Sequence, residues 1–211
     1  MVVLLIMPAV AAATPLTDAV RRNEKAEVEA LLAGGAAINE KDENQDTALL
    51  LATNAASLDV VALLLARGAD LEVANVNAAT PLHLAVERGR VTIVKLLLAK
   101  GVNPNAKNVH SATALHVCAE TGRDDIAALL LDNKADIDAR NLHQATPLHL
   151  AAESGKVDVL QVLLDRGADR NAKNLAGATP IELARPDSPV LPLLRGEVTE
   201  VQAQPREAKL P

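Results

Sequence analysis

The sequence predicts an all-α fold, a solenoid of about six stacked helix-turn-helix units joined by β-hairpin fingers. The main observation is a threonine that recurs at a fixed step of 33 residues: Thr14, Thr47, Thr80, Thr113, Thr146 and Thr179. A leucine series and two glycine series share this step, and the 211-residue chain has no Phe, Tyr or Trp. Several residue types with one spacing indicate a structural repeat, and its units stack because one unit cannot bury its own apolar face.

An apolar segment, residues 1–13, precedes the first repeat. The run Val2–Met7 is followed by Pro8 and an alanine-rich stretch in which Ala11 and Ala13 have the A-x-A spacing of a signal-peptidase site. We expect a secretory signal and a periplasmic or secreted protein. No Lys or Arg precedes the apolar run, so the alternative is a segment that covers the end of the core of a cytoplasmic protein. The run falls short of the roughly 20 apolar residues of a transmembrane helix, and we expect no membrane insertion of the mature chain.

Within one repeat the residue order predicts two short helices. Thr80 is a suitable N-cap, and Pro81 fits the first helical position, where its missing N–H costs no hydrogen bond. Gly89 ends this helix because glycine enters the left-handed region without a Cβ penalty. A second helix then runs to Gly101. Its apolar face comprises Val91, Val94, Leu97 and Leu98.

The same period sets the predicted domain organisation. An asparagine-rich stretch without helical periodicity, residues 102–112, separates two helix pairs as an extended turn segment. The repeats are predicted at residues 14–46, 47–79, 80–112, 113–145, 146–178 and 179–184, the last as a shortened cap. Residues 185–211 are predicted to be a proline-rich, partly disordered tail. In that tail, Leu191, Leu193 and Leu194 are candidates to cover the last repeat.

Short strings that recur within the 33-residue period are similar to those of a known family. Residues 80–85 and 146–151 read T-P-L-H-L-A, residues 113–116 and 47–50 are close variants, and residues 64–70 and 163–169 follow the pattern L-L-x-x-G-A-D. In these strings the chain resembles the ankyrin repeat family, over roughly residues 14–184. The resemblance implies an ankyrin solenoid that binds partner proteins.

Two features depart from the ankyrin pattern. Ankyrin fingers usually carry glycine two residues before the threonine, and here only Gly177 does; the other positions hold Gln45, Ala78, Ser111 and Gln144. The sequence therefore predicts either strain of roughly 1 kcal/mol at each finger or another turn geometry. Lys134 replaces the glycine that follows the second helix elsewhere, which makes its repeat the weakest unit.

Composition and motifs exclude several function classes. A net charge of −6 and the missing aromatics argue against nucleic-acid binding. The single cysteine, Cys118, excludes an internal disulfide and a cysteine-based metal cluster, and it occupies the position of Ala85 and Ala151, so we expect a buried small residue. No nucleophile motif, H-E-x-x-H or phosphate-binding glycine loop occurs. We expect no catalytic residue, metal or cofactor, and an enzyme would need a site of unfamiliar pattern.

The five histidines fall into two groups. In the T-P-L-H strings and the T-A-L-H variant, the resemblance implies that His83, His149 and His116 bond to neighbouring backbone and order the stack. Shared metal coordination between equivalent histidines is excluded because stacked helices lie about 8–10 Å apart. His110 and His143 fall on fingers, where we expect exposure and consider a contact or pH-sensing role.

The resemblance also implies which surface binds a partner: the finger tips and the exposed ends of the first helices. The corresponding finger-tip residues are Val76, Asn77, Val109, His110, Leu142 and His143, with Leu175 and Ala176 on the last finger. The helix-end residues are Glu87, Arg88, Glu120, Thr121, Glu153 and Ser154. The recurring aliphatic tips indicate either an apolar contact stripe or finger-on-finger packing, and the glutamate row indicates either a solvated face or attraction for a basic segment.

These observations lead to one main hypothesis. The chain is a non-catalytic, monomeric scaffold that holds a protein partner of unknown identity through rigid, preorganised contacts. The alternative is a structural or self-assembly module in which the apolar fingers mediate self-association.

Overall fold

The computed structural model describes residues 14–197. The predicted signal segment, residues 1–13, and the last part of the predicted tail, residues 198–211, lie outside the described residues. The chain divides into two compact units, one ending at Val109 and the other beginning at His110. Each unit is described by itself.

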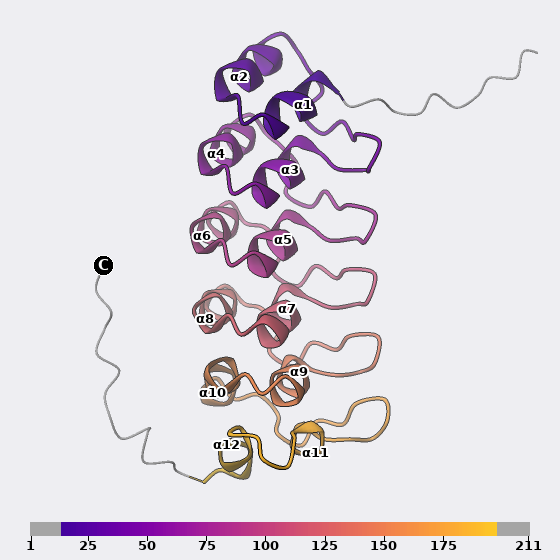
Figure 1. The fold of residues 1–211 in the computed structure, drawn as a ribbon, viewed down its shortest axis with the longest axis vertical. Coiled ribbons are helices and arrows are strands. Elements are labelled where there is room, and N and C mark those ends of the chain that lie inside the picture. Colours follow the sequence, from indigo (N-terminus) through magenta and orange to yellow (C-terminus); the bar gives the residue numbers. More distant parts are fainter. Residues whose placement is uncertain (1–13, 198–211) are drawn as a thin grey trace, which may run out of the picture. The chain divides into compact units, whose positions relative to one another are not determined.

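Unit 1 consists of three helix pairs in sequence order. The helices are α1 (Pro15–Arg21), α2 (Lys25–Ala33), α3 (Ala48–Asn54), α4 (Leu58–Ala66), α5 (Pro81–Glu87) and α6 (Val91–Ala99). The first helix of each pair packs on the first helix of the next, and the second helices form a parallel layer (Figure 1). The finger loops extend from the side of the first helices.

Unit 2 repeats this arrangement. Its helices are α7 (Ala114–Thr121), α8 (Asp124–Asp132), α9 (Pro147–Glu153), α10 (Val157–Asp165), α11 (Pro180–Leu183) and α12 (Leu191–Arg195). Helices α7, α9 and α11 pack in succession, with α8 and α10 behind them. The predicted all-α fold of sequentially stacked helix pairs is therefore confirmed.

The recurring threonine starts every first helix. In each case it has extended backbone and precedes the first helical residue. Its hydroxyl accepts the N–H of the third helical residue, and in all but one repeat the side chain of that residue accepts the threonine N–H in return. The exception is Leu50, which has no acceptor, so Thr47 keeps only the 3.4 Å bond from the Leu50 N–H.

The core combines buried leucines of the second helices with small residues of the first helices; in the first repeat Leu31 is only half-buried, and Val28 is the buried residue of α2. Leu64, Leu97, Leu130 and Leu163 have no exposed surface, and neither do Ala19, Ala52, Ala85, Cys118 and Ala151. Alanine and cysteine let the two helix layers approach closely. One predicted core position is wrong, because Val91 is half-exposed and Ile93 is buried in its place. The buried stripe of α6 is Ile93, Val94, Leu97 and Leu98, which leaves the first helical residue outside it.

The fingers are hairpin-shaped loops, and no strand is assigned between residues 14 and 197. An asparagine side chain replaces strand pairing: Oδ1 of Asn75 accepts the N–H groups of Asn77 and Ala79, each at 3.0 Å. Asn141 and Asn174 close their fingers in the same way. The predicted β-hairpins are thus corrected to loops, because this amide takes the N–H groups that a strand ladder would use.

The fingers without glycine keep the left-handed turn. The φ angles are 62° at Gln45, 51° at Ala78, 54° at Ser111 and 54° at Gln144, beside 79° at Gly177. Lys134 is also left-handed, with φ of 67°. Of the two predicted possibilities, the structure shows the strained turn rather than a different geometry.

We expect Ala78→Gly to stabilise the chain by about 0.5–1 kcal/mol, because glycine removes the Cβ strain of the left-handed turn. The matched control is Ala62→Gly on the exposed face of α4, which should cost about 1 kcal/mol as an ordinary helix substitution. Urea unfolding of both variants measures the two changes. Equal destabilisation by both substitutions would contradict the strain at Ala78.

The described fold continues past Ala184 into α12. In this helix Leu193 and Leu194 are buried, and Leu191 and Pro192 are half-buried. Pro192 lies in the first turn of α12, where the missing N–H costs no hydrogen bond. The predicted covering role of Leu193 and Leu194 is confirmed. The helix that carries these two residues was not predicted.

Candidate functional site

The finger tips of unit 1 expose aliphatic side chains. Val76 is 66% exposed and Val109 is 48% exposed, and Asn77 lies beside Val76 at the surface. The Val109 N–H donates to the Asn77 carbonyl oxygen at 3.0 Å. Neighbouring fingers are therefore joined through their backbones, which leaves the aliphatic side chains directed to solvent.

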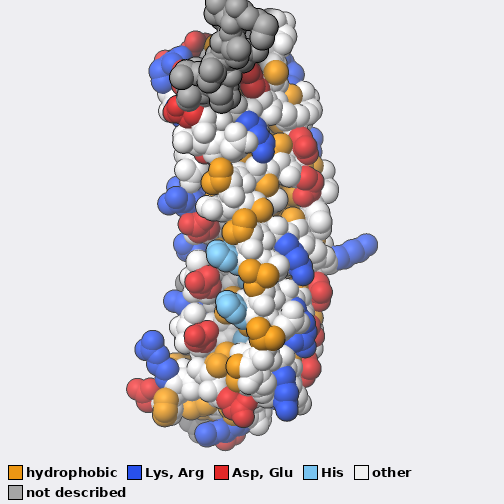
Figure 2. Space-filling model, turned by 90° about the vertical axis from the view of Figure 1, so that its right-hand side faces the viewer, with side chains coloured by type: hydrophobic (Ala, Val, Ile, Leu, Met, Phe, Trp, Pro, Cys, Tyr) orange, Lys and Arg blue, Asp and Glu red, His pale blue; other side chains and the backbone are white. Residues whose placement is uncertain are grey.

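Unit 2 has the same arrangement with histidine beside the aliphatic residue. Leu142 is 55% exposed and Leu175 is 71% exposed, and both His110 and His143 are exposed. The N–H groups of Leu142 and Leu175 donate to the carbonyl oxygens of His110 and His143 at 2.9 and 2.8 Å. Figure 2 looks onto the finger side and shows histidine side chains next to hydrophobic ones.

A small open cavity lies at the last two finger tips of unit 2. Its volume is about 370 Å³, and its lining comprises His143, Asn174, Leu175 and Ala176. Arg140 holds the two fingers together, since its Nη1 donates to the carbonyl oxygens of Lys173 at 2.8 Å and Gln144 at 3.1 Å. The finger tips are thus exposed, apolar and fixed in position by backbone and side-chain bonds.

The predicted helix-end residues lie at the ends of the first helices. In unit 1, Glu87 is the last residue of α5 and Arg88 caps it, and both are exposed. In unit 2, Glu120, Glu153 and Ser154 are exposed at the ends of α7 and α9. Thr121 differs, because it is half-buried and its hydroxyl donates to the Val117 carbonyl oxygen at 2.6 Å. Thr121 is therefore engaged within its own helix.

Comparison with protein families identifies the repeat. A family model described as ankyrin repeats (3 copies) matches residues 2–75, 68–141 and 107–174. The chain belongs to the ankyrin repeat family. Ankyrin repeats are generally protein–protein interaction modules and are typically non-catalytic. No curated protein matches the chain with significant similarity.

The histidines at the fourth position of the ankyrin T-P-L-H and T-A-L-H strings have a structural role, as predicted. Nδ1 of His149 accepts the Thr146 N–H at 3.1 Å and lies 2.9 Å from the Thr146 hydroxyl, while Nε2 lies 3.1 Å from the Ala178 carbonyl oxygen. Because Nδ1 accepts, the ring is neutral and Nε2–H donates to Ala178. His116 makes the same set of bonds to Thr113 and Ala145. Each ring joins the start of a first helix to the finger that follows.

Cys118 is a buried structural residue of the ankyrin core. It has no exposed surface, which confirms the prediction. Burial raises the pKa of its thiol, and the nearby Asp125 carboxylate raises it further. The thiol therefore stays protonated and is a poor nucleophile.

The part of the chain that the structure describes contains no group of three or more His, Cys, Asp or Glu side chains placed to hold a metal ion. Between residues 14 and 197, no helix is both long and apolar enough to cross a membrane.

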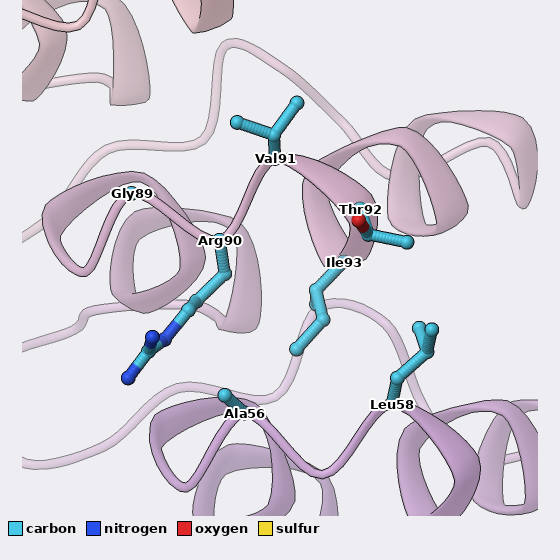
Figure 3. A pocket seen from close by; sticks show the side chains of 7 residues that line it. All are labelled: Ala56, Leu58, Gly89, Arg90, Val91, Thr92 and Ile93. Carbon is cyan, nitrogen blue, oxygen red and sulfur yellow. The ribbon is translucent and has the colours of Figure 1, made fainter. Parts of the chain in front are cut away.

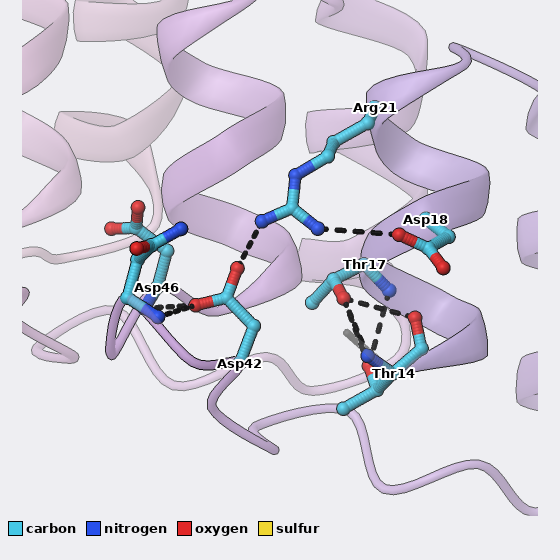
Figure 4. Close-up of polar contacts among 7 residues, drawn as sticks. Thr14, Thr17, Asp18, Arg21, Asp42 and Asp46 are labelled. Carbon is cyan, nitrogen blue, oxygen red and sulfur yellow. Dashed lines mark hydrogen bonds and ion pairs between the residues drawn. The ribbon is translucent and has the colours of Figure 1, made fainter. Parts of the chain in front are cut away.

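An ionic contact at the start of the array was not predicted from the sequence. Asp42 closes the first finger where later fingers have asparagine, and its side chain is fully buried. Its Oδ1 accepts the N–H groups of Asn44 at 2.8 Å and Asp46 at 2.9 Å, and its Oδ2 pairs with Nη2 of Arg21 (Figure 4). Nη1 of Arg21 lies 3.3 Å from Asp18. Partial burial raises the pKa of Asp46, and the Asp42 charge adds to this shift. The only sequence signal was the change from Asn to Asp within the 33-residue series.

Proposed function

We propose that this ankyrin protein is a non-catalytic scaffold that binds a partner protein through its finger tips and first-helix ends. The observation that carries the proposal is the exposure of one aliphatic residue on each of four fingers: Val76, Val109, Leu142 and Leu175. Scattered apolar residues are common on protein surfaces, but these four recur at one register of a repeat. Within each unit, backbone bonds between neighbouring fingers hold the tips in place, so a partner would bind preorganised finger tips.

The glutamates beside the fingers set the proposed charge preference. Glu87 in unit 1 and Glu120 and Glu153 in unit 2 occupy equivalent helix ends. Exposed carboxylates attract a basic segment, and salt weakens this attraction. The proposed partner therefore combines apolar contact residues with positive charge.

The test is partner capture by the double variant Leu142→Asp with Leu175→Asp. Two carboxylates on the apolar contact should reduce the amount of captured partner at least about tenfold. The matched control, Ala62→Asp on α4, places a carboxylate on an exposed residue away from the fingers and should retain capture. Undiminished capture by the double variant would refute the finger-tip surface.

Self-association through the fingers is the second candidate, favoured by the same exposed aliphatic residues. Light scattering over a range of concentrations separates the two, since the scaffold proposal expects a monomer at all of them. Growth of the apparent mass with concentration, abolished by the double variant, would support self-assembly instead.

Export to the periplasm or the extracellular space forms part of the proposal. Its support is the apolar run and A-x-A spacing within residues 1–13. The alternative is a cytoplasmic protein. The N-terminal mass of the protein from its native source distinguishes a cleaved chain from an intact one.

A further inference from the structure

An open apolar groove lies on unit 1, and no finger-tip residue lines it. It forms where the turn between α3 and α4 meets the turn between α5 and α6, and its volume is about 360 Å³. The lining residues are Ala56, Leu58, Gly89, Arg90, Val91, Thr92 and Ile93. In Figure 3, the side chains of Arg90 and Ile93 extend toward the neighbouring repeat, which carries Ala56 and Leu58. The groove therefore needs both repeats.

Leu58 gives the groove an exposed apolar wall. It is 39% exposed, and among the described residues it is the only large exposed hydrophobic side chain outside the finger tips. The equivalent first position of the second helix holds Lys25 and Asp124 in two other repeats. A solvated side chain is therefore compatible with this position, and the leucine leaves apolar surface uncovered.

The charge around the groove is positive. Arg90 is the only charged residue in the lining, and among the described residues no carboxylate lies within ion-pair distance of it. Residues 88–102 contain two arginines and two lysines but no Asp or Glu, in a chain of net charge −6. Each of the other nine-residue helices carries at least one carboxylate. Asp59 follows Leu58 on α4 and does not line the groove.

We infer that this groove binds a partner segment in which an aliphatic side chain is flanked by carboxylates. The aliphatic side chain would cover Leu58 and the apolar walls beside Ala56 and Ile93, while a carboxylate pairs with Arg90. Charge complementarity selects this occupant over a basic one. The groove thus selects the opposite charge from the glutamate row, and the inference stands independently of the finger-tip proposal.

The test uses a defined probe, the N-acetylated peptide amide Glu-Glu-Leu-Glu-Glu, titrated into methyl-labelled full-length protein. We expect saturable shifts of the Leu58, Val91 and Ile93 methyl signals in two-dimensional NMR spectra. Replacing the leucine of the peptide by alanine should weaken binding about tenfold, because most of the apolar contact is lost. Replacing its glutamates by glutamine should weaken binding about fivefold and remove most of its salt dependence.

Protein variants separate the groove from other basic surfaces. With Arg90→Gln, the glutamate and glutamine peptides should bind alike, and Leu58→Ala should weaken both. The matched control is Arg185→Gln, at an exposed arginine of unit 2 outside the groove and the finger tips, which should leave binding unchanged. All three residues are exposed, so the spectra of the variants should keep the native dispersion. Absence of saturable shifts at millimolar peptide, shifts centred outside the groove, or equal affinity of the two peptides for the wild type would overturn the inference.

Discussion

Replacing Asp42 by alanine is expected to lower the free energy of unfolding by about 2–4 kcal/mol. The substitution removes the acceptor of the Asn44 and Asp46 N–H groups, and each lost hydrogen bond costs about 1 kcal/mol. It also removes the buried partner of Arg21. Because the Arg21 side chain is 34% exposed, water compensates part of that loss.

Asp42→Asn separates the two contributions. Asparagine closes the later fingers by the same two N–H bonds, so this variant keeps the turn and loses only the charge on the Arg21 partner. We expect a loss of about 1 kcal/mol, together with a lower pKa of Asp46, since the neighbouring negative charge is gone.

Urea unfolding gives both free energies, and amide hydrogen exchange at Asn44 and Asp46 reports the turn itself. Exchange should accelerate strongly in Asp42→Ala and little in Asp42→Asn. Equal losses in the two variants would show that the ion pair, rather than the turn, dominates the contribution of Asp42.

The helices were predictable because their signals are local and repeated. A threonine followed by proline or alanine fixes where each first helix begins, and the N-cap bond that explains it spans only three residues. The leucine and alanine series identified the core for the same reason. Val91 was wrongly predicted to be a core residue because four apolar residues at helical spacing can be chosen in two ways on the nine-residue helix α6. Packing against α4 decides in favour of Ile93.

Features that break the period could not be predicted from it. Arg21 and Asp42 occur together only in the first repeat, because the later repeats hold Asn or Glu in place of Arg21 and Asn in place of Asp42, so the period gives no signal for their contact. The groove at Leu58 and Arg90 needs two neighbouring repeats to stack before its walls meet. Helix α12 follows Pro186 and Pro189 and carries Pro192 in its first turn, so no helix was predicted there. The finger tips were found from the sequence because they obey the period, although their binding role stays a prediction.

The second large effect is expected at His149, where substitution by alanine should cost about 2–4 kcal/mol. The ring has no exposed surface and occupies both of its nitrogens. Alanine removes one of the two donors to the Ala178 carbonyl oxygen, which keeps the Asn174 N–H; it also removes the acceptor of the Thr146 N–H and opens a cavity. His143→Ala, at an exposed histidine of the neighbouring finger, is the matched control and should change stability by less than about 0.5 kcal/mol.

The same residue predicts a dependence of stability on pH. Burial lowers the pKa of His149 below its ordinary value of 6.5, and the charge of Arg140 lowers it further, although the bond to Ala178 opposes the shift. The unfolded chain therefore takes up a proton as the pH falls through 6.5, while the folded chain does not. Above that pH the contribution of His149 to the free energy of unfolding is fully present. Below it the contribution falls by at most about 1.4 kcal/mol per pH unit until the pKa of the folded state is reached.

Urea unfolding at a series of pH values from roughly 7.5 down to about 5 measures this slope, since the ordinary histidine pKa falls inside that range. The wild type should lose stability across the series, and the difference between wild type and His149→Ala should narrow as the pH falls, because the variant has no imidazole to protonate in either state. If the difference between wild type and His149→Ala stayed constant with pH, the ring would be protonated equally in the folded and unfolded chains, and the neutral, doubly bonded imidazole described above would be wrong.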